Sequence, residues 1–100
     1  MAIKVTKENF NDLINEDKLT LVDFYADWCG PCRALGPVIE EIASELTHVN
    51  IGKLNVDDDS DIASKYGVRS IPTMIIFKGG KEIDRLVGFL PKEQIVSKLK

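Results

Sequence analysis

This sequence of 100 residues has little cysteine, no marked excess of charge of either sign and no long hydrophobic run. Two cysteines are too few for a framework of structural disulfides, and a formal net charge of −3 provides no basic surface for nucleic acid. The apolar runs are much shorter than a membrane span, and the first residues lack the basic-then-apolar pattern of a secretory signal. We therefore expect a soluble protein in a reducing, cytoplasmic setting that binds neither membrane nor nucleic acid.

The composition is that of an ordinary folded domain. The length is enough for one continuous core, and 44% of the residues are hydrophobic while 29% are charged. No linker, internal repeat or low-complexity segment divides the chain. Residues 1–100 are therefore expected to form a single domain.

Both cysteines lie in the segment Trp28–Cys32. The residues before it, 19–26, are an apolar run typical of a buried strand, and the apolar residues after it recur at helical spacing to about residue 46. The thiols thus lie where a strand ends and a helix begins, and there unpaired N–H groups and the helix dipole stabilise a thiolate. Since the thiolate is the form that attacks disulfides, this segment predicts a redox site.

The order of residues within this segment predicts their roles. Cys29 and Cys32 are three apart, so their sulfurs can close a small ring on one helix face. We expect Cys29, nearer to the helix end and to solvent, to be the nucleophile, and Cys32 to be the resolving thiol. Gly30 lets another backbone approach, and Pro31 fixes φ in the first turn without wasting a donor. Trp28 is expected partly on the surface, where it shields the first thiol and contacts partners.

Two charged residues stand among apolar ones on predicted strands. Asp23 lies within the run 19–26, where an acid would be buried. Its carboxyl group is hydrogen-bonded to backbone, or is more exposed than the pattern indicates, or is a proton carrier behind Cys32 with a pKa raised by desolvation. Lys53 is in phase with the apolar residues of a third predicted strand, 49–56, and either extends to the strand end or is an electrostatic partner of Asp23.

The last third of the chain contains further turn signals. Gly79-Gly80 separates two strand-like runs, 73–77 and 81–87, and predicts a two-residue hairpin with the second run as an edge strand. Pro91 is predicted at the first position of the last helix. With the earlier elements, this indicates an α/β domain whose helices cover both faces of a central mixed sheet.

Several of these segments together resemble thioredoxins. The matching stretches occur in the family's order and cover essentially the whole chain: Ala26-Asp27-Trp28-Cys29-Gly30-Pro31-Cys32, Lys53-Leu54-Asn55-Val56-Asp57, Tyr66-Gly67-Val68-Arg69-Ser70-Ile71-Pro72-Thr73 and Val87-Gly88. A lone CxxC is a weak signal because zinc sites also use it, but CxxC between a strand and a helix with a later Ile-Pro-Thr is specific. The resemblance implies the thioredoxin fold: a central mixed five-stranded sheet in the order β-α-β-α-β-α-β-β-α, flanked by four helices.

The resemblance also implies roles for residues outside the cysteine segment. Asp23 matches the family's proton-carrying aspartate, and Lys53 matches the lysine paired with it. Pro72 matches a cis proline facing the thiols, which would leave the backbone of Ile71 free to pair with an extended substrate segment. Gly88 matches a glycine that leaves room for the substrate backbone beside the first thiol.

The resemblance implies reduction of protein disulfides through a mixed-disulfide intermediate, in a monomer that needs no bound cofactor or metal. The implied partners are disulfide-containing proteins and an NADPH-dependent flavoenzyme, thioredoxin reductase. Three alternatives remain: a binding module in a larger complex, a disulfide oxidase or isomerase, and a metal site. The Gly-Pro dipeptide resembles the reducing members of the family, and two thiols with His48 supply at most three metal ligands.

Overall fold

Five strands form one mixed sheet in the computed structural model, which describes residues 1–100. The elements in chain order are β1 (Ile3–Lys4), α1 (Phe10–Ile14), β2 (Thr20–Tyr25), α2 (Gly30–Glu45), β3 (Asn50–Asn55), α3 (Ser60–Lys65), β4 (Thr73–Lys78), β5 (Lys81–Val87) and α4 (Lys92–Ser97). The strands are arranged in the order β1-β3-β2-β4-β5, with β2 parallel to β3 and antiparallel to β4. This confirms the predicted fold class and order of elements.

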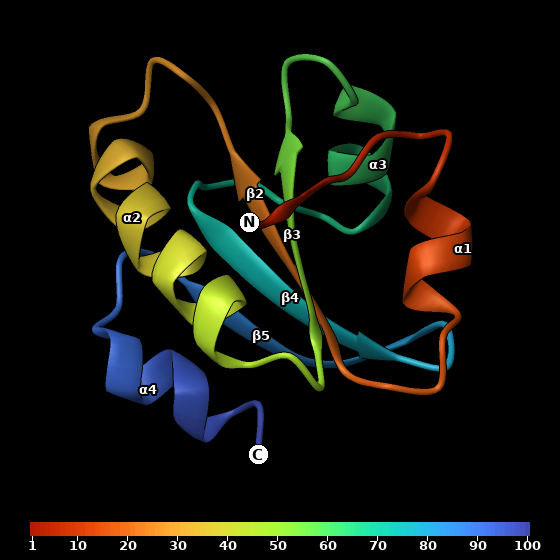
Figure 1. Cartoon of the computed structure of the whole chain (residues 1–100). Helices are drawn as coiled ribbons and strands as arrows, with labels where there is room; N and C mark the ends of the chain where they lie inside the picture. Colours follow the sequence, from red (N-terminus) through yellow and green to blue (C-terminus); the bar gives the residue numbers. More distant parts are fainter.

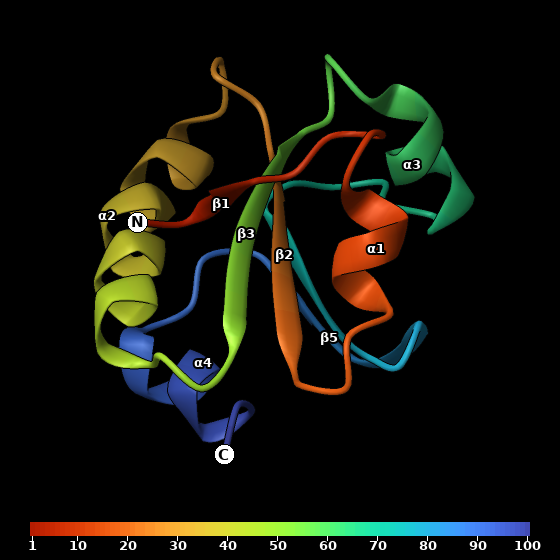
Figure 2. The ribbon, with the colours of Figure 1, turned by 45° about the vertical axis from the view of Figure 1, so that its right-hand side comes forward.

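The helices form two layers, one on each face of the sheet. Figures 1 and 2 show α1 and α3 together on one face and α2 and α4 together on the other. The central strand β2 is buried on both faces, which explains why its sequence is apolar in both phases. Its side chains alternate as predicted: Val22 and Phe24 join the core under α1 and α3, whereas Leu21 joins the core under α2 and α4.

The cysteine segment lies in the connection from β2 through α2 to β3. It therefore lies just beyond the carboxyl end of the central strand, a common position for sites in open α/β sheets. Leu35, Ile39 and Ile42 are fully buried and hold α2 against the sheet. This helix continues through Pro37 and has 16 residues; no helix of the structure is long and apolar enough to cross a membrane.

The C-terminal part follows the predicted hairpin but differs at the last helix. Gly79 and Gly80 form the turn with φ of +59° and +84°, a conformation that suits glycine, and β5 has its predicted bounds. Pro91 was predicted at the first position of the helix; instead it is the N-cap, and the helix begins at Lys92. The reason is its extended backbone, with ψ of 151°, which leaves the helical region although φ is the usual −63° of proline.

Candidate redox site

The N-terminus of α2 holds both cysteines. Cys29 is the N-cap residue, and Gly30 and Pro31 form the start of the helix. The backbone N–H of Cys32 donates a hydrogen bond to Sγ of Cys29 at 3.2 Å. The two sulfurs are joined in a disulfide across a Cα–Cα distance of 5.2 Å, so they close the small ring that their spacing predicts. The first sulfur therefore lies at the positive end of the helix dipole.

The expectation that Cys29 lies nearer to solvent than Cys32 corresponds to no clear difference in exposure in this disulfide form. The two cysteines are nearly equally buried, with exposed fractions of 5% and 4%. Both belong with Ala26 to a small buried cluster, against which Tyr25, Val56 and Ile71 pack. What distinguishes Cys29 is its position as the helix cap and the 3.8 Å distance between its Sγ and the carbonyl oxygen of Ile71.

Trp28 lies on the surface beside the disulfide, as predicted, with 69% of its area exposed. Its indole Nε1–H donates a hydrogen bond to Oδ2 of Asp57 at 2.9 Å. Sequence reasoning missed this acceptor, because it considers Asp57 only as the last residue of a stretch that resembles thioredoxins. The strand topology could have predicted the contact: Trp28 follows β2, Asp57 follows β3, and the carboxyl ends of adjacent parallel strands lie together.

The loop before β4 also approaches the disulfide, through Ile71. The Ile71–Pro72 peptide bond is cis, and neither the N–H nor the C=O of Ile71 forms a backbone hydrogen bond. Gly88 donates its N–H to the carbonyl of Pro72 at 2.8 Å and has a φ of +89°. A Cβ placed on Gly88 or on Gly30 would meet no atom within 4 Å, so the space beside both glycines is open.

The carboxyl group of Asp23 is completely buried. Neither of its oxygens has a hydrogen-bond partner within the chain. Burial raises the pKa of Asp23 from 3.8 to about 7, because desolvation penalises the charged form; attraction to Lys53 acts in the opposite direction and is smaller. The two alternatives to a proton carrier, a carboxylate hydrogen-bonded to backbone and an exposed one, are therefore wrong.

Lys53 lies beside Asp23 on the neighbouring strand without forming an ion pair with it. The two residues are Cα partners in the parallel register of β2 and β3. Lys53 belongs to none of the ion pairs in the structure, and its Nζ lies 4.8 Å from the centroid of the Tyr25 ring. Its charge thus acts on Asp23 without direct contact.

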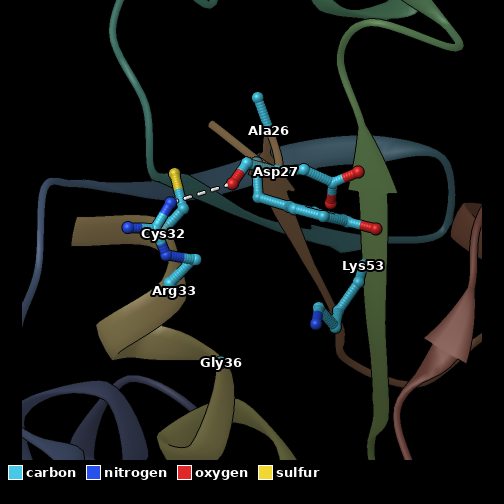
Figure 3. Close-up of a pocket in the computed structure, with 7 residues that line it drawn as sticks. Ala26, Asp27, Cys32, Arg33, Gly36 and Lys53 are labelled. Atoms are coloured by element: carbon cyan, nitrogen blue, oxygen red, sulfur yellow. Dashed lines mark hydrogen bonds between the residues drawn. The ribbon is translucent and has the colours of Figure 1, made fainter. Parts of the chain in front are cut away.

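A pocket of about 280 Å³ lies beside Cys32, away from the loop that precedes β4. It is lined by Tyr25, Ala26, Asp27, Cys32, Arg33, Gly36 and Lys53. Figure 3 shows Lys53 extending from β3 toward α2, and the guanidinium of Arg33 donating to the backbone carbonyl of Asp27 at 3.1 Å. Cys32 is thus bordered by a pocket whose lining includes two basic side chains.

Comparisons with known proteins agree with this geometry. The chain matches the family model for thioredoxin over residues 1–100. It is 54% identical over 98 residues to thioredoxin 2 of Chlorobaculum tepidum, covering 96% of this chain and 90% of the relative. The chain belongs to the thioredoxin family.

Other thioredoxins support the same assignment. A thioredoxin of Chlamydia caviae is 51% identical over 96 residues, covering 96% of this chain and 93% of the relative. A solved mutant thioredoxin from Halobacterium salinarum superposes with a TM-score of 0.91 at 33% identity, over 98% of this chain and 87% of that chain. The thioredoxin of Malassezia sympodialis gives a TM-score of 0.86 at 35% identity, over 97% and 87%.

As a thioredoxin-family protein with a disulfide at CxxC spacing, the chain is a thiol-disulfide oxidoreductase. His48, the third residue considered as a metal ligand, is exposed and follows the far end of α2. No group of three histidine, cysteine or acidic side chains is arranged to hold a metal ion. The redox-active pair of this thioredoxin-family chain is Cys29–Cys32, which comprises both of its cysteines.

Proposed function

We propose that this chain is a protein-disulfide reductase, working as a single domain over residues 1–100. The observation that carries the proposal is the position of Cys29: its Sγ caps α2 and accepts the N–H of Cys32 at 3.2 Å. The thioredoxin relatives and the Gly-Pro dipeptide between the cysteines support the reducing direction. The pair starts each cycle as two thiols and ends it as the disulfide.

In the first step, the Cys29 thiolate attacks one sulfur of a substrate disulfide. The new bond joins Cys29 to the substrate, the substrate S–S bond breaks, and the other substrate sulfur leaves as a thiolate. The N–H groups at the start of α2 stabilise the attacking thiolate before this step.

In the second step, Cys32 attacks Sγ of Cys29 and resolves the mixed disulfide. Its thiol must first lose a proton, and we assign Asp23 as the acceptor because a buried carboxyl with a pKa of about 7 can take up a proton near neutral pH. The Cys29–Cys32 bond forms, the bond to the substrate breaks, and the second substrate sulfur leaves as a thiolate. Two electrons pass to the substrate in all. Lys53 limits the rise in the pKa of Asp23.

Substrate binding is assigned to the surface around the disulfide. The unpaired backbone of Ile71 can hydrogen-bond to an extended substrate segment, and Pro72 holds this loop against the site. Open space at Gly30 and Gly88 leaves room for a second backbone. The exposed Trp28, with Pro31 near it in the chain, supplies apolar contact. Pairing through main chain rather than side chains suits a broad range of protein substrates.

The oxidised chain must regain two electrons before the next cycle. Members of the thioredoxin family are generally reduced by thioredoxin reductase, and we propose such an NADPH-dependent flavoenzyme as the partner here. A reducing compartment such as the cytoplasm suits this cycle, because its thiol pool keeps the dithiol form available. In this scheme the chain acts as a monomer and carries no cofactor of its own.

Trapping the mixed disulfide tests the proposal. Cys32→Ser should accumulate a covalent complex with a disulfide protein such as insulin, whereas Cys29→Ser should form none. The reduction potential of the wild-type pair, measured against a dithiothreitol series, should lie well below the cytosolic glutathione poise. A potential near that of oxidising enzymes would favour an oxidase or isomerase. Full cellular function of Cys29→Ser would favour the binding module.

A further inference from the structure

We propose that Tyr25 is a positioning residue for this reaction: its ring holds the Lys53 ammonium away from the Asp23 carboxyl group. The proposal rests on the role assigned above to Asp23 and extends it to a residue two positions along the same strand. Tyr25 packs against the cluster that contains the disulfide, but the role proposed here is exerted through Lys53.

The geometry around Asp23 lacks an ion pair that the strand register would allow. Asp23 and Lys53 are Cα partners on adjacent parallel strands, so their side chains leave the sheet side by side. Both carboxylate oxygens nevertheless lack a partner, and the ammonium lies 4.8 Å from the ring centroid of Tyr25. Tyr25 shares the face of Asp23 because the two are two residues apart on β2.

The ring offers the ammonium a specific alternative to the carboxylate. A cation within about 6 Å of an aromatic ring centroid is attracted to the electron-rich face, and more strongly where water is partly excluded. Tyr25 and Lys53 are both partly buried, which fits this condition. On the other side, a Cβ placed on Gly36 of α2 would lie 3.9 Å from Nζ, so the ammonium lies between the Tyr25 ring and α2 (Figure 3).

This placement determines how Asp23 can act. An ammonium in direct contact would favour the ionised carboxylate and lower its pKa, leaving a weak proton acceptor. With the ammonium held on the ring, desolvation dominates and the pKa of Asp23 is raised to about 7. The ring therefore helps to keep the carboxyl group in the range where it can exchange protons with Cys32 near neutral pH.

The other charged groups near this site do not replace Lys53. On β4, Met74 is the Cα partner of Asp23 and carries no charge. On α2, Cys32 and Arg33 line the pocket, but Arg33 is exposed and donates to a backbone carbonyl. The pKa of Tyr25 is raised chiefly by burial and further by Asp27 and Asp58, whereas neither of these two acids contributes to the raised pKa of Asp23. Lys53 is the cation whose attraction lowers the pKa of Asp23.

The test is a carboxyl ¹³C NMR titration of Asp23 in the oxidised full chain. Tyr25→Met removes the ring but keeps most of the apolar volume, whereas Tyr25→Phe keeps the ring and removes only the hydroxyl. We expect the pKa of Asp23 to fall by about one pH unit in Tyr25→Met, as the ammonium moves to the carboxylate. It should stay unchanged in Tyr25→Phe. An unchanged or raised value in Tyr25→Met overturns the proposal.

A double-mutant cycle separates the effect of the ring on Lys53 from entry of water. In the Lys53→Met background, Tyr25→Met should leave the pKa of Asp23 unchanged, because there is no ammonium to move. A fall as large as in the wild-type background would show that hydration is responsible and would overturn the proposal. If Tyr25→Met does not fold, Tyr25→Leu serves in the same cycle.

A kinetic measurement distinguishes failure of this inference from failure of the proposed function. The rate at which Cys32 releases substrate from the mixed disulfide is followed against pH in wild type and Tyr25→Met. We expect the pH midpoint of this rate to move down together with the pKa of Asp23. If the pKa falls and the rate profile does not move, the placement of Lys53 by Tyr25 is upheld and the assignment of Asp23 as proton carrier is overturned.

Discussion

The two faces of the central sheet have cores of the same size but different chemical character. Under α1 and α3, ten buried residues include Phe10 and Phe77, whose rings contact each other and Tyr66 edge to face at 5.3 to 5.6 Å. Under α2 and α4, the ten buried residues are aliphatic apart from Met74. On this second face, Asp23 follows the aliphatic residues toward the carboxyl end of β2, and the disulfide lies beyond that end.

Under the proposed mechanism, the two faces differ in how far stability is lost in favour of the reaction. On the α1 and α3 face the ten core residues are all apolar, and their burial favours folding because it removes apolar surface from water. On the other face Asp23 occupies a fully buried position without a hydrogen-bond partner, an arrangement that costs free energy. The two faces share β2, so changes confined to either one should separate stability from redox function.

The largest effect on folding should come from truncating a buried aromatic side chain on the α1 and α3 face. Phe77→Ala removes a fully buried ring that contacts two others, and should lower the free energy of unfolding by about 3–5 kcal/mol. Urea denaturation measures this loss. The reduction potential of the folded variant should equal that of wild type, since the ring lies on the face opposite the site. A shifted potential would show that the faces are not separable.

Removing the buried acid should have the opposite effect on stability. In wild type the folded state keeps a proton on Asp23 up to about pH 7, whereas an unfolded chain releases it near pH 3.8. Between these values the folded state binds more protons, so wild-type stability falls as pH rises. The stability of Asp23→Asn does not fall in this way. Its free energy of unfolding should equal that of wild type below pH 3.8 and exceed it by about 4 kcal/mol above pH 7.

Denaturation of both proteins across this pH range, at constant ionic strength, measures the gain. Because the amide introduced by Asp23→Asn carries no charge at any pH, the difference between the two curves isolates the ionisation of the Asp23 side chain. A gain that does not change with pH would mean that Asp23 is not titrating in the folded state. The variant should also resolve mixed disulfides slowly near neutral pH, which links the stability cost to the reaction.

Much of this contrast between the faces was predictable from local pattern. Period-two alternation along β2 separates Val22 and Phe24 from Asp23, and the change to helical spacing after Cys29 locates the helix terminus. The same alternation identifies Asp23 as a charge among apolar residues. These features depend only on neighbours in sequence, so the sequence is sufficient to predict them.

Contacts between distant segments were harder to predict. The near-equal burial of the two cysteines depends on Ile71 and Val56, which pack on the disulfide from other elements. The bond from Trp28 to Asp57 depends on two loops meeting at the sheet edge, and the ring of Tyr25 over Lys53 depends on strand register and rotamers. Local pattern predicts which face a residue occupies, whereas its partner is decided by tertiary packing.

A smaller effect, on the pKa of Asp23, should follow from removing the Lys53 ammonium on the α2 and α4 face. Lys53→Met deletes the ammonium that lowers the pKa of Asp23, so that pKa should rise by up to about one pH unit. A larger share of Asp23 would then be protonated at pH 7, and release of substrate by Cys32 should slow there and recover at higher pH. Carboxyl NMR and the pH profile measure both changes. A lowered pKa would contradict the assigned role of Lys53.

The smallest effect should come from the rim of the site, where loss of one surface contact leaves both cores intact. Asp57→Ala removes the acceptor that orients the exposed Trp28 indole. One hydrogen bond contributes about 1 kcal/mol, so KM for a protein disulfide should rise about fivefold while kcat and the unfolding midpoint stay unchanged. Asp58→Ala, an exposed neighbour without this bond, is the matched control. An equal rise in both variants would assign the effect to lost negative charge; a rise in Asp57→Ala alone would show that indole orientation contributes to substrate binding independently of stability.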